Sequence, residues 1–204
     1  MKRCVIVSGA KIEDYQKIKS FLLPDDYFVF CDCGLLHAEK LGVSPDFVVG
    51  DFDSADKPKQ TENMLVLPTV KDDTDTFAAV KLMLSKGFKD FLLLGAIGGR
   101  LDHTFGNVSA LLYLQEKGAK AKIVDDYSEM FLIENTVKIE RESCSYFSLI
   151  SLSDKLEGVN IIGAKYPLEN AEINSSFQFG ISNEPTFDTE ISVSKGNALL
   201  IKVF

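Results

Sequence analysis

Two groups of carboxylates follow predicted strands, and they are the residues in this chain best suited to chemistry. Asp51 and Asp53 come directly after the apolar run 47–49, and Asp72 and Asp75 follow the next apolar run. Alternate residues of an extended chain point to one side about 6–7 Å apart, so Asp51 and Asp53 can aim at one point. Crowded carboxylates repel one another, and Mg2+, a hard cation that also binds substrate phosphates, relieves that repulsion. The two groups predict a magnesium–phosphate site.

Each group also has an ordinary explanation. A strand can end in a solvated turn such as Asp51–Asp53, and one carboxylate at a helix start satisfies the free N–H groups and the dipole there. Asp72 and Asp75 share a helix face. The run 72–75 holds three carboxylates in four residues, which is more than a cap needs. The combination therefore favours the metal site.

A glycine-rich turn follows a later predicted strand. Residues 95–100 read Gly-Ala-Ile-Gly-Gly-Arg, and Asp102 and His103 come next. Glycines let backbone amides approach an anion, the following helix offers free N–H groups, and Arg100 carries a fork of donors suited to phosphate. The alternative is an ordinary turn with a solvated Arg100 and Asp102 as the helix cap. The spacing matches neither the Walker loop nor the dinucleotide-binding fingerprint.

Hydrophobic periodicity predicts alternating strands and helices in residues 1–135. Strands are expected at 4–8, 27–31, 47–49, 64–67, 91–94 and 121–124, and helices at 13–22, 35–41, about 73–85 and about 103–117. Such alternation is typical of a largely parallel sheet flanked by helices, an α/β fold. The polar motifs, including Asp32 after the second strand and Ser8-Gly9 after the first, fall at strand carboxyl ends, where ligands bind in such sheets.

Residues 136–204 have a different character. Short β-rich runs are expected at 137–139, 146–151, 158–162, 175–177, 186–193 and 199–204, and no amphipathic helix is evident. This pattern predicts a small all-β, sandwich-like domain. A polar turn at 180–184, which contains Ser182 and Asn183, follows Phe177 and Phe179. It is either a plain hairpin turn or part of a pocket for a flat heterocycle.

Composition narrows the class of protein. The chain has 204 residues, 46% of them hydrophobic, and a net charge of −8. A nucleic-acid binder usually carries a basic face, so nucleic acid is not expected as a partner. There is no signal peptide and no run of about 18 apolar residues, so we expect a cytoplasmic protein with no membrane association. The four cysteines lack zinc or redox spacing and are expected to be reduced thiols. His37, in a predicted helix, has no predicted role.

Taken in order, these motifs resemble thiamine pyrophosphokinase, the bacterial form. The resemblance covers nearly the whole chain and rests on residues 31–34, 45–54, 71–76, 95–107 and 180–184. It implies an N-terminal α/β domain, a C-terminal β domain, and a homodimer with the active site between subunits. The implied reaction transfers pyrophosphate from ATP to the thiamine hydroxyl, giving thiamine diphosphate and AMP.

The resemblance also assigns roles to residues of this chain. Asp51, Asp53 and Asp75 correspond to the Mg2+ group, with Asp72 beside them. The ATP side would include Asp32, Arg100, Asp102, His103 and Asn107, and Ser182 and Asn183 would face the thiamine pyrimidine. Two positions depart from the family pattern: Cys33 stands where a glycine is usual, and Pro185 where an aromatic is common.

The expected mechanism is in-line attack of the thiamine hydroxyl on the β-phosphorus of ATP, with Mg2+ neutralising charge and Arg100 steadying phosphate oxygens. Asp72 is the candidate acceptor of the hydroxyl proton. Two other functions remain open from the residues themselves. One is a Mg2+-dependent phosphohydrolase with Asp51 as nucleophile, and the other is a non-catalytic protein that binds a nucleotide or thiamine.

Overall fold

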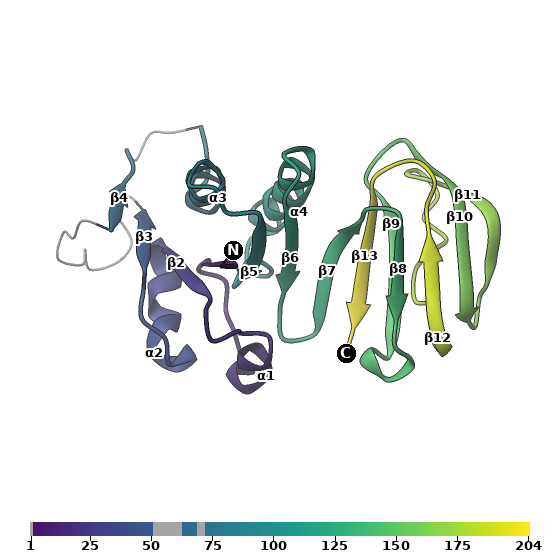
Figure 1. The fold of residues 1–204 in the computed structure, drawn as a ribbon, viewed down its shortest axis with the longest axis horizontal. Helices are drawn as coiled ribbons and strands as arrows, with labels where there is room; N and C mark the ends of the chain where they lie inside the picture. Colours follow the sequence, from purple (N-terminus) through teal and green to yellow (C-terminus); the bar gives the residue numbers. More distant parts are fainter. Residues whose placement is uncertain (1, 51–62, 69–71) are drawn as a thin grey trace. The chain divides into compact units, whose positions relative to one another are not determined.

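The computed structural model describes residues 2–50, 63–68 and 72–204. They form two compact units, residues 1–126 and residues 127–204, each with a hydrophobic core of its own (Figure 1). No helix in the described ranges is long and apolar enough to cross a bilayer.

The first unit is built on a parallel sheet. Its described strands, in the spatial order β4-β3-β2-β1-β5-β6, are β4 (Met64–Val66), β3 (Phe47–Gly50), β2 (Tyr27–Cys31), β1 (Cys4–Val7), β5 (Asp90–Leu94) and β6 (Lys120–Val124). All neighbouring pairs in this series run parallel. The central strands are buried along nearly their whole length, which explains their continuous apolar sequences.

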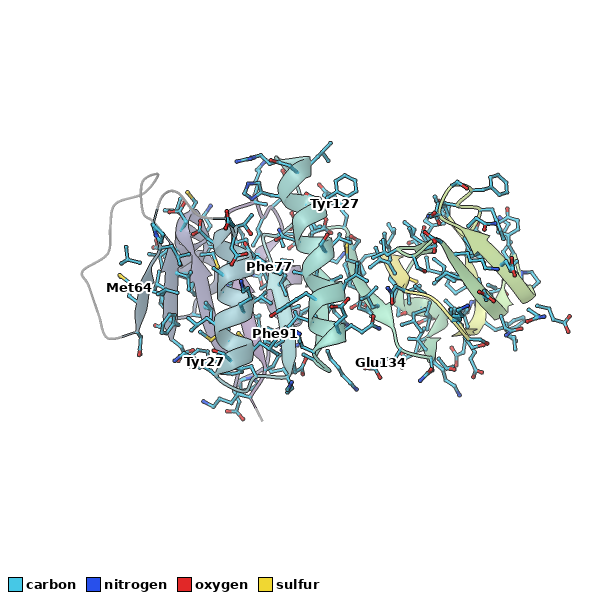
Figure 2. The ribbon with its side chains drawn as sticks, turned by 90° about the horizontal axis from the view of Figure 1, so that it is seen from above. Tyr27, Met64, Phe77, Phe91, Tyr127 and Glu134 are labelled. Carbon is cyan, nitrogen blue, oxygen red and sulfur yellow. The ribbon has the colours of Figure 1, made fainter. Side chains whose placement is uncertain are left out.

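Helices cover both faces of this sheet. On one face lie α1 (Tyr15–Ser20) and α2 (Ala38–Leu41), and on the other lie α3 (Asp75–Ser85) and α4 (Leu101–Glu116) (Figure 1). Ile18 of α1 and Leu41 of α2 join the core cluster built on the sheet. Figure 2 shows α3 and α4 side by side over the opposite face, where the ring of Phe77 lies 5.1 Å from that of Tyr113.

Local sequence sets where these helices begin and end. Thr74 is the N-cap of α3, and its hydroxyl accepts a hydrogen bond from the Phe77 amide at 3.2 Å. The residue after α2 is Gly42, whose φ of 72° is the left-handed conformation that commonly ends a helix. A 3-10 helix, η1 (Asp32–His37), joins β2 directly to α2. The helix expected over 35–41 is therefore partly 3-10, and it begins earlier.

Backbones pack closely where β1, η1 and β5 meet. A Cβ atom added to Gly34 in η1 would lie 2.1 Å from the Val7 carbonyl oxygen. One added to Gly95, just after β5, would lie 2.3 Å from the Ser8 carbonyl oxygen, and Gly95 also has a φ of 56°. Only glycine fits these two positions. The close approach brings the carboxyl ends of three neighbouring strands together.

The second unit is a β-sandwich. One sheet has the order β7 (Ser128–Ile133), β13 (Ala198–Val203), β9 (Tyr146–Ser151), and the other has the order β11 (Leu168–Asn174), β10 (Lys155–Ala164), β12 (Pro185–Ser192), β8 (Thr136–Ile139). All described pairs are antiparallel, and a short 3-10 helix, η2 (Arg141–Ser143), precedes β9. Phe147 and Leu200 from one sheet and Val159 and Ile191 from the other share one core.

The structure confirms the α/β fold with a separate β unit and corrects details of the second unit. Residues 175–177, expected as a strand, form a turn with one isolated bridge. Two strands were not predicted. In β11 only Ile173 is buried, so its apolar alternation is weak. In β7 the carboxylate of Glu129 points inward and pairs with Lys202 at 2.6 Å, which breaks the alternation.

The division between the units falls at residues 126/127, whereas the expected boundary was 135/136. The difference is the strand β7, which pairs along its length with β13 and so belongs to the second unit. No Gly- or Pro-rich linker precedes β7, so composition did not indicate the division.

The tight packing at Gly34 makes a test of the fold. We expect Gly34→Ala to destabilise the protein by about 1–3 kcal/mol or more, because the added methyl group overlaps a backbone oxygen that cannot move independently. Gly106→Ala in α4 is the matched control: beyond the backbone of its own helix no atom lies within 4 Å of its added Cβ, and alanine in a helix is expected to stabilise by about 0.5–1 kcal/mol. Thermal unfolding of the two variants measures both effects, and equal midpoints would contradict the described packing.

Candidate active site

A cleft of about 370 Å³ lies at the carboxyl edge of the parallel sheet in the first unit. Loops after β1, β2 and β5 and the first turns of α3 and α4 form it. Its lining is Ser8, Gly9, Ala10, Lys11, Cys31, Asp32, Cys33, Thr74, Asp75, Thr76, Gly95, Ala96, Gly98, Gly99, Arg100, His103 and Asn107. Strands β1 and β5 are neighbours, and the chain leaves them toward opposite sides of the sheet, which is the topological switch point where such sheets bind ligands.

Asp32 is the most unusual residue of the cleft. It follows β2 directly and has a φ of 42°, a left-handed conformation that is uncommon for residues other than glycine. Its Oδ1 is buried and is the one buried side-chain oxygen or nitrogen in the described part of the chain without a hydrogen-bond partner. Its Oδ2 accepts a weak hydrogen bond from the Cys33 thiol at 3.3 Å. A buried carboxylate oxygen with no partner is costly unless a ligand completes it.

The carboxylates of the second acidic group, residues 72–75, lie in different places relative to the cleft. Asp75 lies in the first turn of α3 and lines the cleft. Asp72 is exposed and does not line it, and Asp73 pairs with Lys81 at 2.8 Å along the helix surface. The predicted metal ligands Asp51 and Asp53 lie outside the described residues.

A buried hydrogen bond fixes the start of α3 against β1. The hydroxyl groups of Ser8 and Thr76 lie 2.7 Å apart, and both residues are buried. Because Thr76 is next to Asp75, this contact holds the acidic turn against the end of the sheet. Sequence reasoning did not identify Thr76. The available signal was a hydroxyl residue on the otherwise apolar buried face of a predicted helix.

The glycine-rich turn is held from within α4. Asn107 is buried, and its amide donates a hydrogen bond to the Ala96 carbonyl at 2.8 Å. Gly98 and Gly99 both have positive φ values, and the Thr104 hydroxyl accepts from the Gly98 amide at 3.3 Å. Asn107 therefore shapes the turn that lines the cleft. His103 is exposed and also lines it.

Arg100 and Asp102 form a two-armed ion pair at the start of α4. Arg100 Nε lies 3.2 Å from Asp102 Oδ1, and its terminal nitrogen lies 2.6 Å from Oδ2. Hydrogen bonding from Arg100 lowers the pKa of Asp102 to about 2. Their side chains are 69% and 64% exposed, and exposed pairs of this kind are easily exchanged for another anion. Asp102 does not line the cleft; it restrains Arg100, which does.

In the second unit, Ser182 and Asn183 occupy a tight turn before β12. Ser182 is exposed and has a φ of 58°. Asn183 is buried: its Oδ1 accepts from the amides of Tyr166 and Glu184, and its Nδ2 donates to the Tyr166 carbonyl at 2.8 Å. The Asn183 amide is thus engaged in holding the turn, and Ser182 is the residue that the turn presents to solvent.

The structure therefore gathers most of the expected site residues of the first unit. Around one cleft lie Asp32, Asp75, Arg100, His103 and Asn107, from three separate segments of the chain. Asp72 and Asp102 lie beside this group without lining the cleft. Their proposed functions, and those of Ser182 and Asn183, remain predictions.

Family models match both units of the chain. The catalytic domain of thiamin pyrophosphokinase matches residues 18–123, and the vitamin B1 binding domain of the same family matches residues 134–200. The chain belongs to the thiamin pyrophosphokinase family. The predicted resemblance is confirmed by these two matches, which fall in the order expected.

Relatives of known name agree with this membership. A thiamine pyrophosphokinase of Bacillus subtilis is 26% identical over 99% of both chains, and thiamin pyrophosphokinase 1 of Caenorhabditis elegans is 25% identical over 78% of this chain and 70% of that protein. The crystal structure of a thiamin pyrophosphokinase from Geobacillus thermodenitrificans has a TM-score of 0.83 at 28% identity, and it covers 99% of this chain and 97% of its own. The crystal structure of the B. subtilis protein superposes with a TM-score of 0.85, which confirms the fold.

Membership decides among the functions left open by the residues. The chain is an enzyme of the thiamin pyrophosphokinase family and transfers pyrophosphate from ATP to thiamine, giving thiamine diphosphate and AMP. ATP is the co-substrate. The phosphohydrolase and the non-catalytic binding protein receive no support, since the matched model is that of a catalytic domain of a transferase.

The Arg100–Asp102 pair can be tested by titration. In Arg100→Gln we expect the pKa of Asp102 to rise from about 2 toward its ordinary value of 3.8, because its main hydrogen-bond donor is lost. A carboxyl whose pKa is lowered by folding contributes stability above its ordinary pKa, and this contribution disappears as pH falls from about 4 to 2. Carboxyl-carbon NMR titration measures both proteins, and an unchanged Asp102 pKa in Arg100→Gln would contradict the described pair.

Proposed function

We propose that pyrophosphate transfer takes place in the cleft at the carboxyl edge of the first unit, with Asp32 and Asp75 facing the ATP phosphates. The observation that carries this proposal is the unpartnered, buried Oδ1 of Asp32 at the topological switch point. Strained backbone conformations and buried polar atoms without hydrogen-bond partners are found at binding sites, where a bound ligand supplies the missing partner. The Asp75 carboxylate, on the first turn of α3, supplies a second acidic group at the same cleft.

The residues of this cleft suit Mg2+. The acidic side chains that line it offer carboxylate oxygens, which are the ligands that this ion prefers. We propose that Asp32 and Asp75, together with Asp51 and Asp53, hold the ion. When bound, Mg2+ neutralises charge on the ATP phosphates. Among the described residues no group of three metal-ligating side chains is present, and Asp51 and Asp53 lie outside them.

The glycine-rich turn supplies the complementary positive groups. Its glycines, Gly98 and Gly99, have positive φ values and no side chain to keep an anion away from the backbone, and the start of α4 adds the positive end of the helix dipole. Arg100 can exchange the Asp102 carboxylate for phosphate oxygens because their pair is exposed. We propose that Asn107 keeps this turn in place and that His103 donates to phosphate from the edge of the cleft.

Positioning and electrostatics then account for the chemistry. The thiamine hydroxyl oxygen forms a bond to the β-phosphorus of ATP, the bond from that phosphorus to the α-phosphate oxygen breaks, and AMP departs. The hydroxyl proton passes to a carboxylate; the candidate is Asp72, which is exposed beside the cleft and does not line it, so the proton leaves the cleft to reach it. Arg100 stabilises charge on the phosphate oxygens as the leaving group separates.

The second unit is proposed to bind thiamine and to form the dimer. Large apolar side chains are exposed near the Ser182 turn or on neighbouring loops, namely Tyr146, Tyr166, Phe177, Phe179 and Ile181. Exposed apolar groups in such number indicate a binding surface. We propose that Ser182 contacts the pyrimidine of thiamine, that Asn183 holds the turn, and that the active protein is a cytoplasmic homodimer whose partner subunit completes each site.

Asp32→Asn tests the catalytic proposal. We expect this variant to remain folded and its kcat/KM to fall by about 100-fold or more, because the change removes charge from the group that faces the metal and phosphates. The assay mixes ATP, Mg2+ and thiamine and follows AMP and thiamine diphosphate by mass spectrometry.

Asp73→Asn is the matched control for this experiment. It makes the same Asp-to-Asn change in the acidic run 72–75. The Asp73 carboxylate pairs with Lys81 on the surface of α3, and Asp73 does not line the cleft. Its turnover should equal that of the unmodified protein. Normal turnover of folded Asp32→Asn at saturating Mg2+ would remove the cleft from the mechanism.

The dimer can be tested separately. Light scattering coupled to gel filtration should give twice the chain mass of 22.6 kDa. Replacing exposed apolar groups with charge, as in Phe179→Asp with Ile181→Asp, should shift the mass toward one chain because the interface loses apolar area. A single-chain mass for the unmodified protein at micromolar concentration would refute the proposed dimer.

A further inference from the structure

His37 is a buried histidine whose ring is hydrogen-bonded on both sides. It is the last residue of η1, the segment that begins with Asp32, and it is 8% exposed. Its Nε2 lies 3.0 Å from the Ala10 carbonyl oxygen, and its Nδ1 lies 2.7 Å from the Tyr15 hydroxyl. A carbonyl oxygen only accepts, so Nε2 carries a proton and donates. In the neutral ring Nδ1 then accepts from Tyr15, and burial lowers the pKa of His37, which favours this neutral form.

Ala10 lies at the centre of the cleft-forming loops. Its carbonyl accepts from His37, and its amide donates to the Gly95 carbonyl at 2.9 Å. One residue of the β1 loop thus bridges η1, which carries Asp32, and the turn after β5, which leads to Arg100. Ala10 and Gly95 both line the cleft, whereas His37 does not.

The Ala10 loop is also held at its far end. The Asp126 carboxylate accepts from the backbone amides of Glu13 and Asp14 at 2.9 and 2.8 Å. Tyr15, the first residue of α1, therefore has a defined position from which its hydroxyl can donate to His37. The loop begins at Ser8, whose amide donates to the Leu94 carbonyl, and between Ser8 and Glu13 the His37 ring of η1 donates a hydrogen bond to the loop backbone.

We propose that His37 is a positioning residue for the reaction: by donating to the Ala10 carbonyl it fixes the loop after β1 against the Asp32 segment and the Gly95 turn, and so sets the width of the ATP cleft. This inference rests on the proposed function, since it takes the cleft to be the ATP site. The ring touches no reacting group, so its effect is expected on ATP binding and not on thiamine binding.

Two amide variants test the donor. His37→Gln retains an N–H group that reaches the Ala10 carbonyl, and its carbonyl can accept from Tyr15. His37→Asn has the same chemistry, but it is one methylene shorter and does not reach Ala10. We expect the KM for ATP to rise about tenfold or more in His37→Asn and to stay within about threefold in His37→Gln, as for residues that support a binding group indirectly. The KM for thiamine should be unchanged in both.

Asp26→Asn is the control for loss of stability alone. Asp26 pairs with Arg3 at 2.7 Å at the opposite, amino edge of the same sheet. Its variant should lower Tm while leaving the KM for ATP unchanged. If His37→Asn does not fold, Tyr15→Phe takes its place in the experiment. This variant removes only the hydroxyl that bonds to His37, and it should raise the KM for ATP with little change in Tm.

The outcomes separate this inference from the proposed function. A normal KM for ATP in His37→Asn, or in Tyr15→Phe where that variant replaces it, overturns the inference. The inference is also overturned if the KM for ATP rises in His37→Gln as much as in His37→Asn. The same holds if it rises as much in Asp26→Asn when Tm falls by the same amount. Asp32→Asn, measured in parallel, reports on the cleft itself. If Asp32→Asn is impaired and His37→Asn is normal, only the role of His37 fails; if Asp32→Asn is normal, the proposed site fails.

Discussion

Close backbone contact at the switch point of the parallel sheet is the constraint on which the rest of the first unit depends. Gly34 and Gly95 each lie so near a carbonyl oxygen of the β1 end that no side chain fits. This contact places the ends of β1, β2 and β5 within one cleft. Since each of these strands ends in a polar segment, the packing of glycines decides which polar groups face one another.

The electrostatic problem of the site is the binding of a polyanion by an acidic chain. The net charge is −8, so attraction of the whole protein for ATP does not help binding. The cleft instead combines a small number of local groups. The positive end of the α4 dipole and the exposed Arg100 offer positive charge on one side, and Asp32 and Asp75 suit a cation on the other. Structural hydrogen bonds from Thr76, Asn107 and His37 hold these segments in place.

The second unit is stabilised separately from the first. Its two sheets bury a core of their own, so it does not depend on the cleft for stability. The turn that carries Ser182 has a left-handed residue, and the buried amide of Asn183 supports it through three hydrogen bonds. The aromatic side chains around this turn are exposed, which suits a surface that binds a flat ring or a second subunit.

The sequence by itself determined the alternation of strands and helices, the change to an all-β region, and the motifs that resemble the family, because periodicity and turn residues are local properties. It also indicated Asp32, Asp75 and Arg100. Only the tertiary structure decided that Asp32 Oδ1 is buried without a partner, that Asp102 restrains Arg100, that Asn183 supports its turn, and that His37 bridges to Ala10. The burial of Asp32 and the contacts of Asn183 and His37 depend on segments distant in the chain, about which the spacing of residues carries no information, and the local Arg100–Asp102 pair depends on the backbone geometry at the start of α4. The strands β7 and β11 were missed for the same reason, since an inward ion pair and a mostly exposed strand are defined by their partners.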